Sequence, residues 1–249
     1  LAGDLSAVPR DVDYVLHFAV TKRDASRFDD DLAANAEGAG RLLARCRDAR
    51  AFLHCSSAAV YQAKGGEPVA ESDPLGDHHR RMLPTYSLSK IAAEAVVRFA
   101  ARESGVPTTI ARLGVPYGAA GGWPFVHLVM MKQGIQIPVH PSGRNRFPLL
   151  HEDDYVGHVE GLLGAASVPA TVVNWAGSED TCIEDWCAWL GELTGLEPKL
   201  EASEAALEPL PLDLTRMHAL LGPTRVPWRE GIRRMVEARA PELLRDPPG

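Results

Sequence analysis

The segment YSLSK places a tyrosine and a lysine, Tyr86 and Lys90, four residues apart at the start of a stretch with helical periodicity. Side chains at positions i and i+4 of a helix share one face, with Cβ atoms roughly 5–6 Å apart. An ammonium held beside a phenol favours the phenolate, so we expect the pKa of Tyr86 to lie below its usual value of about 10. Such a tyrosine can exchange a proton with an alcohol or a carbonyl near neutral pH. Ser57, at the end of the upstream run HCSS, supplies a hydroxyl for the same substrate oxygen. These are the groups that hydride transfer at a carbinol carbon requires.

The elements that must position these side chains alternate between short apolar runs and longer amphipathic ones. Buried strands are predicted over 14–19, 51–55 and 107–113, with helices over 28–47 and 86–103 between them. Gly105 follows the second helix, where a C-cap glycine belongs. Strands and helices in this order are typical of parallel βαβ units, so the predicted fold class is α/β.

The pattern is weaker beyond Gly118. Helices are predicted over 123–133, 151–163, 184–193 and 228–238, and a strand over 170–175. No internal repeat and no low-complexity segment is found.

Composition narrows the class of protein. The chain has 249 residues, 45% hydrophobic and 24% charged, which is ordinary for a globular enzyme with a sizeable core. The net charge of −7, without a block of basic residues, argues against nucleic acid as a partner. No apolar run approaches the roughly 18 residues that a membrane span needs, and no signal-peptide pattern opens the chain. The four cysteines lack CxxC spacing, so we expect reduced thiols, a cytoplasmic protein and no metal site.

Several segments, in their order along the chain, resemble the extended short-chain dehydrogenase/reductase family, in its NAD-dependent nucleotide-sugar epimerase/dehydratase branch. They are GDL at 3–5, VLHFAV at 15–20, the asparagine at 35 before EGAG, SSAAVY at 56–61, YSLSK at 86–90, RLGVPYG at 112–118, RFPLLHEDDYV at 146–156 and NWAGSEDTCIEDW at 174–186. The resemblance implies a Rossmann-like, doubly wound parallel sheet with a smaller C-terminal substrate lobe. Residues 1–118 and 148–176 would form the NAD(P)-binding domain, and residues 119–147 and 177–249 the lobe.

The resemblance also implies roles for individual residues. The catalytic residues would be Ser57, Tyr86 and Lys90. The cofactor, NAD with NADP not excluded, would contact Asp4, Leu5, Phe18, Ala19, Val20, Asn35, Tyr86, Lys90, Leu113 and Val115. The substrate would contact Ser57, Ala58, Tyr86, Val115 and Arg146. As in relatives, the helices over 28–47 and 86–103 would form a homodimer.

Family members open with a glycine-rich turn that sets backbone amides on the pyrophosphate. GAGRLL at 38–43 lies inside a predicted helix, and GAAGG at 118–122 belongs to a later loop. We therefore expect this turn upstream of Leu1, the alternative being a truncated relative. The residue that separates NAD from NADP would lie there too.

The residues after Ser57 discriminate between reactions. Ala58 and Ala59 stand where the sugar dehydratases carry an acid and a base, and alanine transfers no proton. This leaves 4-epimerases and simple ketone reductases, and the resemblance makes a nucleotide-sugar 4-epimerase the favoured function. Val115 occupies a position where relatives use asparagine on the substrate diphosphate, which leaves open an NADPH-dependent reductase of a non-nucleotide carbonyl compound. A regulator that binds the cofactor without catalysis is the third hypothesis, although such proteins usually lose the tyrosine or the lysine.

Other chemistry-bearing residues have two interpretations each. Arg146 is either a phosphate ligand or a solvated loop arginine. Trp123 packs either on substrate or in the core. For His78 and His79, in a polar loop ahead of the tyrosine, we expect solvated side chains.

Overall fold

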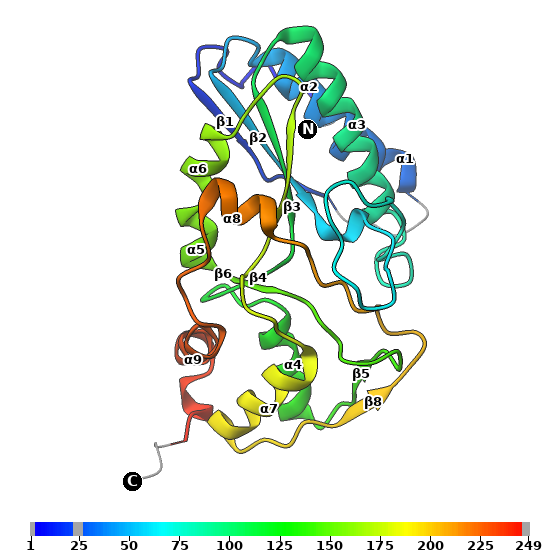
Figure 1. Cartoon of the computed structure of the whole chain (residues 1–249), viewed down its shortest axis with the longest axis vertical. Helices are drawn as coiled ribbons and strands as arrows, with labels where there is room; N and C mark the ends of the chain where they lie inside the picture. Colours follow the sequence, from blue (N-terminus) through cyan, green and yellow to red (C-terminus); the bar gives the residue numbers. More distant parts are fainter. Residues whose placement is uncertain (1–2, 22–26, 246–249) are drawn as a thin grey trace.

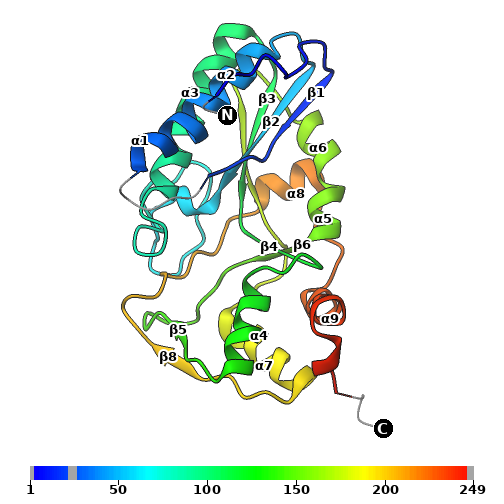
Figure 2. The ribbon, with the colours of Figure 1, turned by 180° about the vertical axis from the view of Figure 1, so that it is seen from behind.

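The computed structural model describes residues 3–21 and 27–245, and its centre is a four-stranded parallel sheet. The strands are β1 (Tyr14–His17), β2 (Ala51–Ser57), β3 (Thr108–Leu113) and β7 (Thr171–Trp175), in the order β1-β2-β3-β7. Helices cover both faces of this sheet (Figures 1 and 2). The predicted α/β class and the doubly wound, Rossmann-like arrangement are confirmed.

One face of the sheet is covered by α1 (Phe28–Asp31), the π-helical turn η2 (Leu32–Glu37), α2 (Gly38–Arg45) and α3 (Tyr86–Ser104). The other face carries α5 (Glu152–Gly157), α6 (Val159–Gly164) and α8 (Thr215–Leu221) (Figure 1). Successive strand residues point to opposite faces. Phe52 and Ile110 therefore pack with α2 and α3, whereas Leu53 and Ala111 pack with α6 and α8. Because the strands are buried on both faces, their sequences are continuous apolar runs.

Helix α3 carries the tyrosine and lysine of YSLSK and runs from Tyr86, at its first turn, to Ser104. Its C-cap is Gly105, at φ 73°, a left-handed conformation that glycine adopts without steric cost. Helix α2 approaches it so closely that a Cβ on Gly40 would overlap Val96. The predicted helix and its end are confirmed.

Below the sheet in Figure 1 lie α4 (Trp123–Gln133), α7 (Ile183–Thr194) and α9 (Trp228–Arg239). They share a second apolar core whose largest fully buried side chain is Trp186. Two parallel pairs of three-residue strands accompany these helices: β4 (Val115–Tyr117) with β6 (Leu149–His151), and β5 (Ile137–Val139) with β8 (Leu200–Ala202). The short helices η3 (Ala58–Val60) and η4 (Pro241–Leu243) complete the elements.

The predicted helix over 151–163 differs from the structure. His151 is the N-cap of α5, and its side chain accepts a hydrogen bond from the Asp153 amide at 3.2 Å. The helical run is then interrupted at His158, so that two short helices stand in place of one.

All four cysteines are buried and free. Within the described part of the chain, no helix is long and apolar enough to cross a membrane, and no group of three or more candidate metal ligands is found.

Candidate active site

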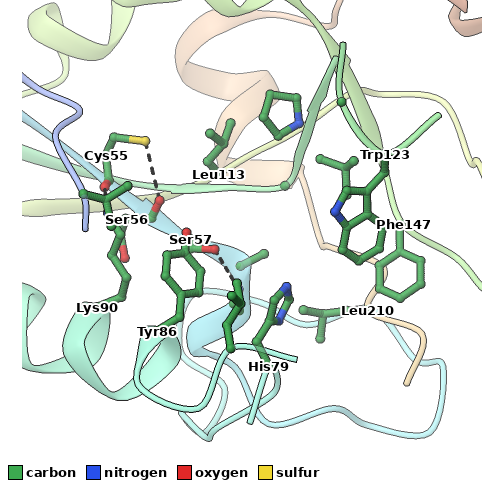
Figure 3. A pocket seen from close by; sticks show the side chains of 18 of the residues that line it. Cys55, Ser56, Ser57, His79, Tyr86, Lys90, Leu113, Trp123, Phe147 and Leu210 are labelled. Carbon is green, nitrogen blue, oxygen red and sulfur yellow. Dashed lines mark hydrogen bonds between the residues drawn. The ribbon is translucent and has the colours of Figure 1, made fainter. Parts of the chain in front are cut away.

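A cavity of about 380 Å³ opens where β1, β2 and β3 end, between the sheet and α4. Parallel strands present their carboxyl ends at one edge, which is where open α/β sheets bind ligands. Ser57 reaches the cavity from the end of β2, and Tyr86 and Lys90 reach it from the first turns of α3 (Figure 3). The structure thus brings the three proposed catalytic residues together at one end of one cavity.

Hydrogen bonds hold these three side chains in place. Ser57 caps the short helix η3, its Oγ accepting from the Ala59 amide at 3.1 Å. The hydroxyls of Ser57 and Tyr86 share a side-chain hydrogen bond. Lys90 is 3% exposed, and its Nζ donates to the backbone carbonyl of Cys55 at 2.7 Å. The lysine is thereby tied to the strand that carries the serine.

The expected direction of the Tyr86 pKa shift is wrong for this structure. Burial raises the pKa of Tyr86 above its usual value of about 10, while the hydrogen bond with Ser57 opposes that shift. Helical spacing places Tyr86 and Lys90 on the same face, but spacing does not report how much water the phenol loses. Tyr86 is therefore a protonated phenol at neutral pH, suited to donate a proton.

Asn35 positions the site without lining it. Its Oδ1 accepts from the Thr21 amide at 2.8 Å, and its Nδ2 donates to the Thr21 carbonyl at 2.9 Å and to Ser89 Oγ at 3.0 Å. The side chain is 4% exposed and belongs to the π-helical turn η2. π-Turns are frequent at functional sites. Here the turn joins the segment after β1 to the helix that carries Tyr86.

A buried ion pair supports β2 and β3 just behind the cavity. Arg112 donates to Glu94 through Nε at 2.9 Å and Nη2 at 2.8 Å, a bidentate arrangement, and both side chains are almost fully buried. Ser56, beside the catalytic serine position, donates to the same carboxylate at 2.6 Å. Arg112 also donates to Tyr61 Oη at 2.9 Å. The strand end that presents Ser57 is thus fixed to α3.

The remaining residues predicted from the resemblance divide into two groups. Those that line the cavity are Phe18, Val20, Ala58, Leu113 and Val115. Those outside its lining are Asp4, Leu5, Ala19, Asn35 and Arg146.

Two members of the second group have clear alternative contacts. The Asp4 carboxylate accepts from the Ser6 amide at 2.8 Å on an exposed segment. Arg146 has Nε 3.5 Å from Asp180 Oδ1, whereas its neighbour Phe147 lines the cavity. Arg146 is thus paired with a carboxylate instead of facing the cavity.

Sequence reasoning missed part of the lining. His79, expected in solvent, lies in the cavity with its ring centroid 6.0 Å from that of Tyr86 and 6.2 Å from that of Trp123 (Figure 3). Trp123, for which both substrate contact and core packing are predicted, lines the cavity and packs edge-on against Phe147 at 5.3 Å. Its signal in the sequence is its place directly after the glycine pair at 121–122. Tyr155 also lines the cavity, and no prediction from the sequence placed it there.

The end of the cavity beside Lys90 can hold a flat, weakly polar ring. Phe18 and Val20 line it from the segment after β1, Leu113 from β3 and Tyr155 from α5. Phe18 and Tyr155 are themselves in ring contact, at 5.7 Å between centroids. These apolar surfaces and the nearby ammonium fit the nicotinamide end of a dinucleotide.

Comparison with known proteins places the chain in a family. Residues 3–173 match the model of the NAD dependent epimerase/dehydratase family, and the chain belongs to that family. Solved structures agree in fold. MoeE5, in complex with UDP-glucuronic acid and NAD, is 20% identical with a TM-score of 0.78, covering 94% of this chain and 81% of that one.

Two further relatives show how wide the similarity is. The UDP-glucuronic acid 4-epimerase from Bacillus cereus, in complex with UDP-glucuronic acid and NAD, is 20% identical with a TM-score of 0.78, covering 95% of this chain and 78% of that one. A curated relative from Simmondsia chinensis, an alcohol-forming fatty acyl-CoA reductase, is 23% identical over 176 residues. That match spans 64% of this chain but 36% of the reductase.

Proposed function

We propose that the chain catalyses NAD(P)-dependent hydride transfer at a carbon that alternates between hydroxyl and ketone. The observation that carries this proposal is the convergence of Ser57, Tyr86 and Lys90 at one end of a cavity at the carboxyl edge of the sheet. Fold similarity alone would not carry it, because one fold hosts many functions.

The chain's own residues would manage the proton and the orientation of the substrate. Ser57 holds the reacting oxygen, and Tyr86 gives a proton to it, or takes one from it, as the carbon gains or loses hydride. Lys90 fixes the strand end through the Cys55 carbonyl and places a positive charge in the same cavity as the phenol. Phe18, Val20, Leu113 and Tyr155 would hold the nicotinamide ring, which supplies or accepts the hydride when NAD(P) is bound.

Two candidates for the substrate follow from different observations. A nucleotide-sugar 4-epimerase is supported by the solved relatives, whose complexes contain UDP-sugars and NAD. A reductase of a non-nucleotide carbonyl compound is supported by the pairing of Arg146 with Asp180, and by a curated relative named as an alcohol-forming reductase. Retention of both Tyr86 and Lys90 argues against a non-catalytic regulator.

Turnover assays test the reaction. The protein is incubated with NAD⁺ or NADPH and a panel of UDP-, GDP- and dTDP-sugars and simple ketones. Interconversion of C4 epimers without net cofactor consumption supports the epimerase, and net NADPH consumption supports the reductase. Tyr86→Phe should reduce turnover by about 10²–10⁴, and Ser57→Ala by less, because the serine holds but does not transfer the proton. Unchanged turnover in Tyr86→Phe would refute the mechanism.

The oligomeric state, the domain boundaries and the cellular location of the protein are further proposals. Phe99 on α3 is 65% exposed beside a groove between α2 and α3, which supports a homodimer formed through these helices. The core shared by α4, α7 and α9 supports a substrate lobe over 119–147 and 177–249, with the exception of α8, which packs on the sheet. The four free, buried thiols support a cytoplasmic location, which imaging of a tagged protein would test.

A further inference from the structure

The side of the cavity facing Tyr86 is an aromatic wall made of His79, Trp123 and Phe147 (Figure 3). Ring contacts run continuously from the phenol across it. The centroids of Tyr86 and His79 are 6.0 Å apart, those of His79 and Trp123 6.2 Å, and those of Trp123 and Phe147 5.3 Å. Leu210, which is 3% exposed overall, adds an aliphatic surface beside it.

The ring of His79 is oriented by a neighbouring histidine. His78 Nε2 lies 2.8 Å from the Glu208 carbonyl oxygen, and the Nδ1 atoms of His78 and His79 are 3.0 Å apart. A carbonyl oxygen only accepts, so His78 Nε2 carries the proton. Burial lowers the pKa of His78, which keeps that ring neutral, and its Nδ1 then accepts from His79 Nδ1. The imidazole of His79 is thereby held in one orientation.

Separate parts of the chain fix the other two rings. Trp123 is the first residue of α4, after Gly122. The Phe147 amide donates to the Thr181 carbonyl at 3.0 Å, and the neighbouring Arg146 carbonyl accepts from the Leu210 amide at 2.9 Å. Because these contacts are made by the backbone, the wall exists before a substrate arrives, and binding does not have to order it.

The charge of the lining is unusual for a site that binds a diphosphate. Among the described residues that line the cavity, Lys90 is the one lysine, arginine, aspartate or glutamate, and its Nζ is engaged with the Cys55 carbonyl. Phosphate groups are generally held by arginine forks, lysines or helix N-termini. The aromatic wall offers flat apolar faces and ring edges in their place.

We infer that the substrate carries, next to its reacting carbon, a neutral substituent with a flat apolar face, an aryl or alicyclic ring that packs against Trp123 and Phe147. The substrate class is then an aryl or alicyclic ketone or the corresponding secondary alcohol. This inference rests on the proposed function, because it takes Tyr86 to mark the position of the reacting oxygen. His79 closes the space between that oxygen and the ring.

Ligand binding to Tyr86→Phe tests the wall apart from the chemistry, because this variant keeps the wall but cannot transfer the proton. Dissociation constants are measured by ligand-observed NMR, with NAD⁺ present, for phenyl methyl ketone, cyclohexyl methyl ketone, butanone and UDP-glucose. We expect the two ring-bearing ketones to bind about tenfold more tightly than butanone, a difference of about 1.4 kcal/mol. Trp123→Ala in the same background should remove that preference.

Phe125→Ala is the matched control, since Phe125 is on the same helix but outside the cavity lining. It should leave the preference intact. Equal binding of phenyl methyl ketone and butanone would overturn the inference, as would tighter binding of UDP-glucose that Trp123→Ala leaves unchanged. Turnover by the wild-type protein, compared with Tyr86→Phe, reports on the proposed hydride transfer separately. A preference for ring-bearing ketones without turnover would refute the proposed hydride transfer. Turnover without that preference would refute the inference that the aromatic wall binds a ring of the substrate.

Discussion

Two buried histidines should make the protein sensitive to mild acid. His17 on β1 and His54 on β2 are paired across the sheet, 3% and 1% exposed, with Nδ1 atoms 2.9 Å apart. Their Nε2 atoms have no hydrogen-bond partner among the described residues. Burial, reinforced by the charge of Lys90, lowers the pKa of His17 to about 4 and that of His54 well below its usual 6.5. Both rings are therefore neutral in the folded protein.

The sign of the effect follows from these shifts. Below pH 6.5 the unfolded chain binds protons at both histidines and the folded protein does not, so stability present above pH 6.5 is lost as pH falls toward 4. Between pH 7 and pH 5 the neutral His17 lowers the stability by about 2 kcal/mol, from 1.4 kcal/mol per pH unit inside the window. This loss is a large part of a typical stability of 5–15 kcal/mol, and His54 adds to it in the same direction.

Urea unfolding at pH 7, 6 and 5, followed by circular dichroism, measures this loss. His17→Asn keeps a hydrogen-bonding group near the position of Nδ1 but cannot titrate. Its stability should fall by about 2 kcal/mol less than that of the wild type between pH 7 and pH 5, whatever its stability at pH 7. Other titrating groups act in both proteins and cancel. His218→Asn, at an exposed site, controls for the substitution itself. The same pH dependence in His17→Asn and wild type would refute the reasoning.

Two further predictions concern positioning and assembly. Asn35→Ala removes three hydrogen bonds, two with the partly buried Thr21 backbone and one with the buried Ser89 hydroxyl. The free energy of unfolding in urea titrations should therefore fall by about 2–3 kcal/mol. An unchanged midpoint would show that these hydrogen bonds are dispensable. Phe99→Asp places a charge on the exposed apolar surface of α3, and light scattering should show a dimeric wild type and a monomeric variant. A monomeric wild type would remove the basis of the homodimer proposal.

The sheet and its main helices could be predicted because their signals are local. β2 and β3 are buried on both faces and therefore appear as uninterrupted apolar runs, and Gly105 marks the end of α3 because only a residue tolerant of φ 73° fits there. The pairing of β4 with β6 could not be predicted. Each strand has only three residues, and β4 contains Pro116, which is uncommon inside a strand. Residues paired between the two strands are more than 30 positions apart in the sequence.

The aromatic wall of the cavity could not be predicted from the sequence for a similar reason. His79 sits in a polar loop whose composition is typical of solvated residues. Its place is set by His78, whose own partner, the Glu208 carbonyl, is 130 residues away along the chain. Arg146 shows the opposite case, because a cation of suitable type for a phosphate is paired with Asp180 in the folded chain. Residue type predicted what each group could do, and long-range contacts decided what it faces.

The protonation state of Tyr86 sets how each direction of the proposed reaction depends on pH. A buried phenol with a raised pKa holds its proton, so it can donate to an oxygen whose carbon has just gained hydride. The reverse direction first requires loss of that proton, which becomes easier as pH rises. The hydrogen bond with the Ser57 hydroxyl favours the phenolate, but burial outweighs it in this arrangement. The site therefore holds a proton that it can donate at neutral pH, and turnover in the direction of alcohol oxidation should rise with pH.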